Sequence, residues 1–402
     1  MKLLLVGHAF LLAYAQQKFV AMKQIDPKLE LRIVVPNVME DRFRTEKYEV
    51  HPCLTKEEVI ALDAHFERVQ QHMTYVHNPA ALGSLLRDFQ PHVVHIDEEP
   101  QALISAETIT LQRLVARNAA VTLFTWDNLL RPRGFPVGAG KSLLRKYSLA
   151  RTSMMICGNK RAAELLRAEG HFRGPIETLP QSGLNVREHQ PGAEQKLRAE
   201  LGLENSVVVG HVGRLVPEKG ILLLLDSLSR LENLPWKLLL VGGGQLEKEI
   251  QNIWVARFPN RIVLVSPVPY DQVTRYLRCI DIFALASYAT PTWAEQFGLS
   301  LAQAMLLGLA CIGSTSGAIP DVLGGAGLLF EEGQADGLAR ALETLLSSPQ
   351  MRRDFGNRAR EFALNHYTVE RVAGGYLAAF EKARRTRMTG KQIGWPVAEN
   401  RT

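Results

Sequence analysis

Short apolar runs recur along the whole chain and constrain its fold more than any other feature. Each half holds six of them, at residues 2–7, 31–36, 92–97, 121–126, 154–158 and 176–180, then at 207–213, 237–242, 261–266, 281–286, 310–314 and 327–330. They are nearly continuous in Val, Ile and Leu, which is typical of strands buried on both faces of a parallel sheet. Helical patterns separate them, for example at 57–74, 101–117 and 335–346. The sequence therefore predicts an α/β fold with two Rossmann-like parallel sheets.

A polar stretch near the middle of the chain separates the two sets of strands. Residues 185–195 are polar and contain Pro191-Gly192, a composition that is typical of a linker. The 402 residues also exceed what one ordinary core accommodates. We predict a first domain over 1–185 and a second domain over 200–367.

The positive charge is concentrated in one part of the chain. The net charge is +6, whereas residues 131–173 carry ten Lys or Arg and two Glu, so this segment is +8 and the remainder is −2. Such a surface could meet anionic lipid or an acidic acceptor, or it could be a solvated helix face. No nucleic-acid recognition motif accompanies it, so we expect no nucleic-acid partner.

The cysteines and the apolar runs bear on location. The four cysteines have no metal-ligand spacing, which favours a reducing compartment. No apolar run approaches the roughly 18 residues of a membrane span. We expect a cytoplasmic protein, with peripheral contact at the inner membrane face through 131–173 as a hypothesis.

Dinucleotide binding is the first function to test for Rossmann-like sheets. It requires G-x-G-x-x-G after the first strand, but Gly7 is followed by His8-Ala9-Phe10. The run Gly242-Gly243-Gly244 also lacks that spacing. Hydride transfer is therefore disfavoured.

The loop after the first strand of the second half carries two cations. The segment G-R-L-V-P-E-K-G, residues 213–220, follows a predicted strand and opens a predicted helix. Loops at the carboxyl ends of parallel strands face the ligand crevice. Arg214 offers a forked guanidinium and Lys219 a compact ammonium, a combination that suits a diphosphate.

A second motif, residues 291–300 with the sequence P-T-W-A-E-Q-F-G-L-S, opens another predicted helix. Gly298 permits a close turn. The N–H groups of Leu299 and Ser300 then begin the helix, where an anion is favoured. Glu295 lies just before this terminus, within reach of hydroxyl groups on whatever carries the phosphate.

Together these motifs resemble the retaining GT-B glycosyltransferases of family 4. The resemblance covers about residues 176–383 and includes L-L-V-G-G-G at 239–244 and G-A-I-P-D at 317–321. It implies a GT-B fold of two facing Rossmann-like domains, with a helix over 368–384 that returns to the first domain. It also implies a UDP- or GDP-sugar as co-substrate, with no obligatory cofactor and no metal site.

The resemblance implies roles for particular residues. Arg214 and Lys219 would bind the donor diphosphate and stabilise the leaving nucleotide, and Glu295 would contact the donor sugar. The remaining donor-binding positions would be Gly213, Pro267, Val268, Phe297, Gly298, Leu299 and Gln303. At Gln303 the family usually has a Glu that binds ribose, so this position departs from the pattern.

The N-terminal half departs further from the family. The first loop lacks Gly-Gly, Trp126 stands about where a His is usual, and His95 to Pro100 is one residue longer than H-x-H-E-P. We place the acceptor side of the cleft at His8, Asp97, Glu98, Trp126 and Asp127, with Glu99 in the same acidic cluster. Trp126 could stack on a sugar and the carboxylates could bind hydroxyls; alternatively, Trp126 packs in the core and the carboxylates cap a helix.

The predicted function is a retaining, metal-independent hexosyltransferase acting on a glycan, a lipid-linked or a small-molecule acceptor. Two alternatives stay open. One is a nucleotide-sugar-binding protein with weak or no transferase activity, which Gln303 and the altered N-terminal motifs suggest. The other is a GT-B nucleotide-sugar epimerase, which would convert the sugar without an acceptor.

Overall fold

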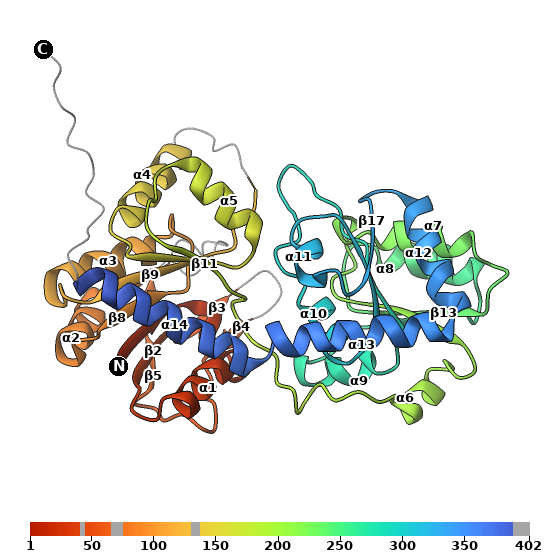
Figure 1. The fold of residues 1–402 in the computed structure, drawn as a ribbon, viewed down its shortest axis with the longest axis horizontal. Helices are drawn as coiled ribbons and strands as arrows, with labels where there is room; N and C mark the ends of the chain where they lie inside the picture. Colours follow the sequence, from red (N-terminus) through yellow and green to blue (C-terminus); the bar gives the residue numbers. More distant parts are fainter. Residues whose placement is uncertain (41–44, 66–74, 130–136, 389–402) are drawn as a thin grey trace, which may run out of the picture. The chain divides into compact units, whose positions relative to one another are not determined.

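The computed structural model describes residues 1–40, 45–65, 75–129 and 137–388. The chain forms two compact units (Figure 1). The first is Met1–Gly183 together with the chain from Val369 onward, and the second is Leu184–Thr368. Each unit is built around its own parallel sheet.

The sheet of the first unit has the strand order β11-β10-β9-β8-β1-β2-β5, and every described pairing in it is parallel. Its strands are β1 (Lys2–Val6), β2 (Glu30–Pro36), β5 (Val59–Leu62), β8 (Val93–Ile96), β9 (Ala120–Thr125), β10 (Met154–Cys157) and β11 (Ile176–Thr178). Two short antiparallel pairs accompany it, β3 (Val38–Glu40) with β4 (Thr45–Lys47) and β6 (Ala64–His65) with β7 (Val76–His77).

The helices of the first unit come from both ends of the chain. They are α1 (Gln17–Ile25), α2 (Pro79–Phe89), α3 (Leu103–Val115), α4 (Val137–Leu149), α5 (Lys160–Glu169) and the C-terminal α14 (Val369–Met388). Helix α14 packs against α1, β8 and β9 and buries Tyr376 and Phe380. The chain thus returns to the first unit through its last helix, as predicted (Figure 1).

The sheet of the second unit has the strand order β14-β13-β12-β15-β16-β17 and is parallel throughout. Its strands are β12 (Val207–Val212), β13 (Trp236–Val241), β14 (Ile262–Val265), β15 (Ile282–Leu285), β16 (Ala310–Ser314) and β17 (Leu328–Phe330). Its helices are α6 (Gln195–Glu200), α7 (Ile221–Ser229), α8 (Glu247–Glu249), α9 (Val273–Leu277), α10 (Leu299–Leu306), α11 (Ile319–Leu323), α12 (Ala335–Ser347) and α13 (Pro349–His366).

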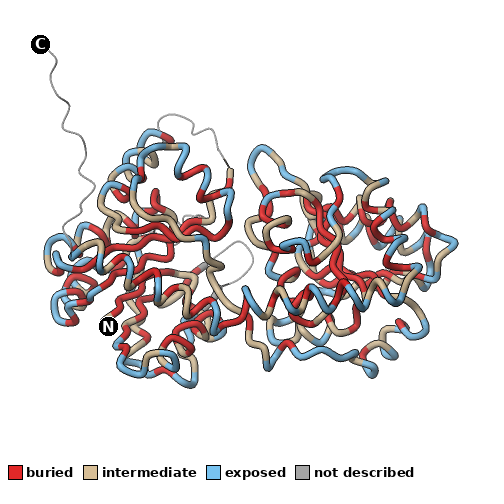
Figure 2. Tube along the Cα trace, in the orientation of Figure 1, coloured by how far each residue is buried: buried red, intermediate tan, exposed pale blue. Residues whose placement is uncertain are grey.

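The strands are the buried centre of each unit (Figure 2). In β1, β8, β12 and β13 nearly every residue is buried, polar His95 and His211 included. This burial on both faces is the reason that the runs contain almost no alternating polar residues. The predicted α/β fold with two Rossmann-like parallel sheets is therefore confirmed, and each of the twelve predicted runs contains a strand.

The helix predicted over 57–74 is wrong. Val59–Leu62 is strand β5 at the edge of the first sheet, and Ala64–His65 is β6. Residues 66–74 lie outside the described part of the chain, as do 131–136 of the predicted basic segment. Among the described helices, none combines the length and the apolarity that a membrane span requires.

Candidate functional site

The strand order of the second unit reverses between β12 and β15. In open α/β sheets, ligands bind outside the carboxyl ends of the strands at such a reversal, because the flanking loops diverge there and leave a crevice. The loop after β12 is the Gly213–Gly220 segment, and the loop after β15 leads through Glu295 to Gly298. The two motifs singled out in the sequence therefore meet at this point.

The centre of the meeting point is an ion pair between Lys219 and Glu295. Lys219 Nζ donates to Glu295 Oε2 at 2.7 Å, and Ser287 Oγ donates to the same oxygen at 3.0 Å. The Lys219 ammonium also lies 5.0 Å from the centre of the Trp293 ring. Glu295 is only 5% exposed, so these donors, rather than bulk water, solvate its carboxylate.

Two glycines allow the loops to pack backbone against backbone around this pair. Gly220 has φ 69°, and a Cβ there would lie 1.9 Å from the carbonyl oxygen of Ala286. Gly317, after β16, has φ 54°, and its Cβ would lie 2.2 Å from the Glu295 carbonyl oxygen. That oxygen accepts the N–H of Ala318 at 2.9 Å. The main chain of Glu295 is thus fixed by a third loop.

The other cation of the first motif is more accessible. Arg214 is exposed, and its Nη2 lies 3.9 Å from Glu218 Oε1. The loop base is tied to the next strand, because Leu215 N–H donates to the Gly243 carbonyl at 2.8 Å. Pro267 packs against Gly243, with its Cγ 2.8 Å from where a Cβ would stand. Gly213 and Pro267 therefore border the same loop, and Val268, next to Pro267, packs against the core of this unit.

The second motif continues into helix α10. Gly298 caps this helix with φ 80°, and its carbonyl accepts the N–H groups of Leu301 and Ala302. The N–H groups of Leu299 and Ser300 precede these first intrahelical donors, as the helix geometry requires. Phe297 packs edge-on against Tyr367 with ring centres 5.5 Å apart.

Gln303 lies one turn further along α10. It is 3% exposed, and its Nε2 lies 3.3 Å from Nε2 of His189. His189 Nδ1 lies 2.8 Å from the Asn185 carbonyl, so Nδ1 donates there and Nε2 accepts from Gln303. The position at which family 4 usually has a Glu thus contacts the segment that opens the second unit.

His211 lies beneath the cationic loop on β12. Its Nδ1 is 3.3 Å from the Ala284 carbonyl, and Nε2 has no hydrogen-bond partner among the described residues. Burial, reinforced by the nearby Lys219 cation, lowers the pKa of His211 to about 4. The imidazole is therefore neutral at pH 7 and does not add to the positive charge of the loop.

The first sheet has a reversal of its own, between β1 and β8. Here His8 follows β1 and Glu98 follows β8. Glu98 Oε1 lies 2.5 Å from His8 Nδ1 and accepts the backbone N–H of His8 at 2.9 Å and the Tyr75 hydroxyl at 2.8 Å. The structure therefore brings together two of the predicted acceptor-side residues.

Asp97 faces the interior of the first unit. It is 2% exposed, its Oδ2 lies 3.4 Å from Lys18 Nζ, and its Oδ1 accepts from Gln181 Nε2 at 2.5 Å. His95 Nε2 lies 3.6 Å from Oδ2. The Lys18 cation and these neighbours outweigh the effect of burial and lower the Asp97 pKa to about 2. Burial lowers the Lys18 pKa, and the Asp97 carboxylate opposes that change.

Glu99, Trp126 and Asp127 form a third group at the same edge. Glu99 accepts from the Thr125 hydroxyl at 2.6 Å and from the Trp126 backbone N–H at 2.8 Å. Burial, with Asp127 nearby, raises the Glu99 pKa to about 7. The half-buried Trp126 ring lies against Gly158, where a Cβ would stand 2.0 Å from the ring, so one part of it packs on the sheet edge.

Several partners of these residues carry no local signal in the sequence. Ser287 contacts the central ion pair, while Tyr75, Lys18 and Gln181 contact the carboxylates of the first unit. Their positions depend on strand order, because Lys18 and Asp97 are 79 residues apart. The two motifs and their glycines at strand ends were the sequence signals that the donor loops meet, whereas these partners carried none.

Comparison with known proteins first gives the class of protein. Anabaena HepE in complex with UDP superposes with a TM-score of 0.71 at 17% identity, covering 95% of this chain and 100% of that one. That likeness and the two parallel sheets confirm the predicted GT-B fold.

The family follows from the sequence. Residues 193–362 match the family described as Glycosyl transferases group 1, which confirms the predicted resemblance for this region. The N-acetyl-alpha-D-glucosaminyl L-malate synthase of Bacillus anthracis is 28% identical over 49% of this chain and 51% of its own length. The D-inositol 3-phosphate glycosyltransferase of Rhodococcus erythropolis is 29% identical over 50% of this chain and 47% of its own. The match thus spans about half the length of both relatives.

Proposed function

We propose that this protein is a retaining glycosyltransferase that transfers a hexose from a nucleotide-diphosphate sugar, with UDP as the first nucleotide to test. The observation that carries this proposal is the Lys219–Glu295 pair at the strand reversal of the second unit. In this pair the Lys219 ammonium, which can bind phosphate oxygens, lies beside the Glu295 carboxylate, which can accept hydrogen bonds from sugar hydroxyls. The UDP complex of HepE, which shares the fold, supports the choice of UDP.

In this proposal Arg214 and Lys219 hold the diphosphate. An ammonium has three N–H donors, so its bond to Glu295 leaves donors for phosphate oxygens. Glu295 accepts hydrogen bonds from the sugar, and the N–H groups of Leu299 and Ser300 face the distal phosphate. The remaining contacts come from Gly213, Pro267, Val268, Phe297 and Gln303.

The reaction is a front-face displacement. The acceptor hydroxyl oxygen bonds to the anomeric carbon while the bond from that carbon to the phosphate oxygen breaks. The hydroxyl proton passes to the departing phosphate oxygen, and the nucleoside diphosphate leaves. The cations stabilise the negative charge that develops on it, which is electrostatic catalysis without an obligatory metal.

The acceptor side is proposed at His8, Glu98, Trp126 and Asp127. Asp97 has a different role here from the one first expected, because Lys18, Gln181 and His95 surround its carboxylate. We assign it to positioning: it holds the end of β8, from which Glu98 and Glu99 extend.

A thermal-shift panel tests the proposal. UDP, GDP and ADP, with UDP-glucose, UDP-N-acetylglucosamine and GDP-mannose, are compared on the native chain and on Lys219→Ala. A ligand that binds only the folded state stabilises it, by about 2.7 kcal/mol at a hundredfold excess over Kd, and thereby raises the melting temperature. We expect one nucleotide to stabilise the native chain and to lose that effect in the variant. No shift with any compound would contradict the donor site.

The same panel separates the second candidate. Gln303, where family 4 usually has a Glu, favours a nucleotide-sugar-binding protein with weak or no transfer. That reading predicts a clear nucleotide shift but no release of nucleoside diphosphate with any acceptor. An epimerase would instead convert the sugar in the absence of an acceptor.

Replacing Trp126 by Ala should lower kcat/KM for the acceptor about tenfold, the size expected for an aromatic contact. Donor hydrolysis by water should change little, because Trp126 lies in the first unit and the donor loops lie in the second. Trp126→Phe, which keeps a ring beside Gly158, is the control. An equal loss of transfer and hydrolysis would remove Trp126 from the acceptor site.

A further inference from the structure

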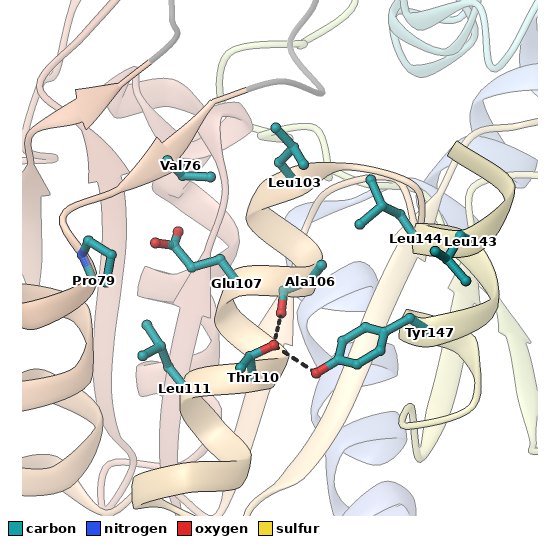
Figure 3. Close-up of a pocket in the computed structure, with 10 residues that line it drawn as sticks. All are labelled: Val76, Pro79, Leu103, Ala106, Glu107, Thr110, Leu111, Leu143, Leu144 and Tyr147. Atoms are coloured by element: carbon teal, nitrogen blue, oxygen red, sulfur yellow. Dashed lines mark hydrogen bonds between the residues drawn. The ribbon is translucent and has the colours of Figure 1, made fainter. Parts of the chain in front are cut away.

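An apolar groove lies in the first unit between α3, α4 and β7 (Figure 3). Its volume is about 640 Å³, within the range of small-molecule sites. Leu103, Leu111, Leu143, Leu144, Val76 and Tyr147 supply most of its walls. None of these residues belongs to the sites described above.

The polar side chains of the walls have hydrogen-bond partners within the first unit. Thr110 Oγ1 donates to the Ala106 carbonyl at 2.7 Å, and the Tyr147 hydroxyl pairs with Thr110 Oγ1 at 2.7 Å (Figure 3). Glu107 accepts the backbone N–H of His77 at 2.9 Å, and burial raises the pKa of its carboxyl. Apart from the Glu107 carboxyl, the groove therefore offers mainly hydrocarbon surface, which favours an apolar occupant.

One end of the groove adjoins the proposed acceptor side. Val76 is next to Tyr75, whose hydroxyl donates to Glu98 at 2.8 Å. Leu103 begins α3 four residues after Glu99, and the Glu99 carbonyl accepts the hydroxyl of Ser105 at 2.9 Å. An amphipathic molecule could therefore place its hydroxyl at the polar cluster and its chain in the groove.

One wall of the groove is basic. Helix α4, which supplies this wall, carries Lys141, Arg145 and Lys146 and no Asp or Glu. On α4, the groove residue Leu143 is 70% exposed and stands between Lys141 and Lys146 in the sequence. The Arg151 guanidinium lies 4.0 Å from the centre of the Tyr147 ring. This charge complements an anionic head group.

From these features we propose that the groove binds the hydrocarbon chain of an anionic lipid, and that this lipid is the acceptor. The assignment of the lipid as acceptor rests on the proposed function, whereas chain binding does not. In transfer, the lipid hydroxyl oxygen bonds to the anomeric carbon, the sugar–phosphate bond breaks, and the hydroxyl proton leaves with the nucleoside diphosphate. The class of acceptor is thereby narrowed from a glycan, lipid or small molecule to an amphiphile.

The test is calorimetric titration of the full chain with n-alkyl phosphates of increasing length, kept monomeric, with inorganic phosphate as the chain-free control. Each buried methylene contributes about 0.8 kcal/mol, so affinity should rise about fourfold per methylene until the groove is filled. Ala106→Trp fills the groove and should abolish this dependence. Leu114→Trp adds the same side chain to an exposed position of α3 outside the groove and should retain it.

The outcomes separate the two proposals. The proposal that the groove binds the hydrocarbon chain is overturned if affinity does not depend on chain length. It is also overturned if Ala106→Trp leaves that affinity unchanged. Binding to anionic vesicles but not to monomers, equal in both variants, also overturns it, because the apolar contact then lies elsewhere. A nucleotide shift in the thermal panel that persists in Ala106→Trp shows the donor site to be intact whichever way the groove is decided. If alkyl phosphates bind but no nucleotide shifts the melting temperature, the groove's role in chain binding stands and the proposed transferase function is contradicted.

Discussion

Lys219→Ala is expected to lower the turnover number of sugar transfer about 10²–10³-fold, the loss typical when one donor to a developing anion is removed. Lys219 Nζ is the cation fixed between Glu295 and the Trp293 ring. Without it, charge on the leaving nucleoside diphosphate is met by Arg214 alone among the two motif cations. The measurement is release of nucleoside diphosphate at saturating donor and acceptor. A variant within a few-fold of the native turnover would contradict the proposed chemistry.

The variant also leaves the buried Glu295 carboxylate without its cation, so lost stability must be separated from lost catalysis. Removing one partner of a buried pair is destabilising because the other charge stays desolvated. Adding Glu295→Gln to Lys219→Ala removes that charge and should restore the melting temperature without restoring turnover. Lys196→Ala is the matched control, since Lys196 forms an exposed pair with Glu200 on α6 that contributes little.

The buried strands were predictable because burial on both faces leaves a continuous apolar signal that needs no knowledge of neighbours. Strand β5 was not. Residues 57–74 have a helical pattern, yet Val59 pairs with Ile33 at the edge of the first sheet. An edge strand carries a weaker pattern, and the available backbone of β2 outweighs local propensity. Tertiary context decided this segment.

The donor motifs were predictable for a different reason. Gly213, Arg214 and Lys219 lie within one loop, and Glu295 and Gly298 within another, so each motif is visible in a short stretch. What joins them is strand order, which places β15 beside β12 across 69 intervening residues, 213–281. The role expected for Asp97 depended on partners that no local pattern reveals. Lys18 and Gln181 approach it only because α1 and the segment after β11 pack on the same sheet end.

The second large prediction concerns the buried ion pair between Lys18 and Asp97. Asp97→Asn should lower the free energy of unfolding of the first unit by about 3–5 kcal/mol at pH 7. The Lys18 ammonium, 1% exposed, would lose its counterion. It would keep the Gln181 carbonyl at 2.6 Å and the faces of nearby aromatic rings, of which Tyr376 at 4.4 Å is the nearest. Urea unfolding followed by circular dichroism measures the change. Asp88→Asn, on the exposed side of α2, is the control and should stay within about 0.5 kcal/mol.

A double variant and a pH series decide whether charge is the cause. Lys18→Met added to Asp97→Asn removes both charges and should recover much of the loss, because an apolar side chain of similar length fills the site. The folded-state pKa of Asp97 is depressed from 3.8 to about 2. Its contribution is therefore fully present above pH 3.8 and is lost as the pH falls toward 2. The native chain should lose stability through that window, whereas the double variant should lose less. Equal acid sensitivity, or a double variant no more stable than Asp97→Asn, would show that shape rather than charge holds this end of the sheet.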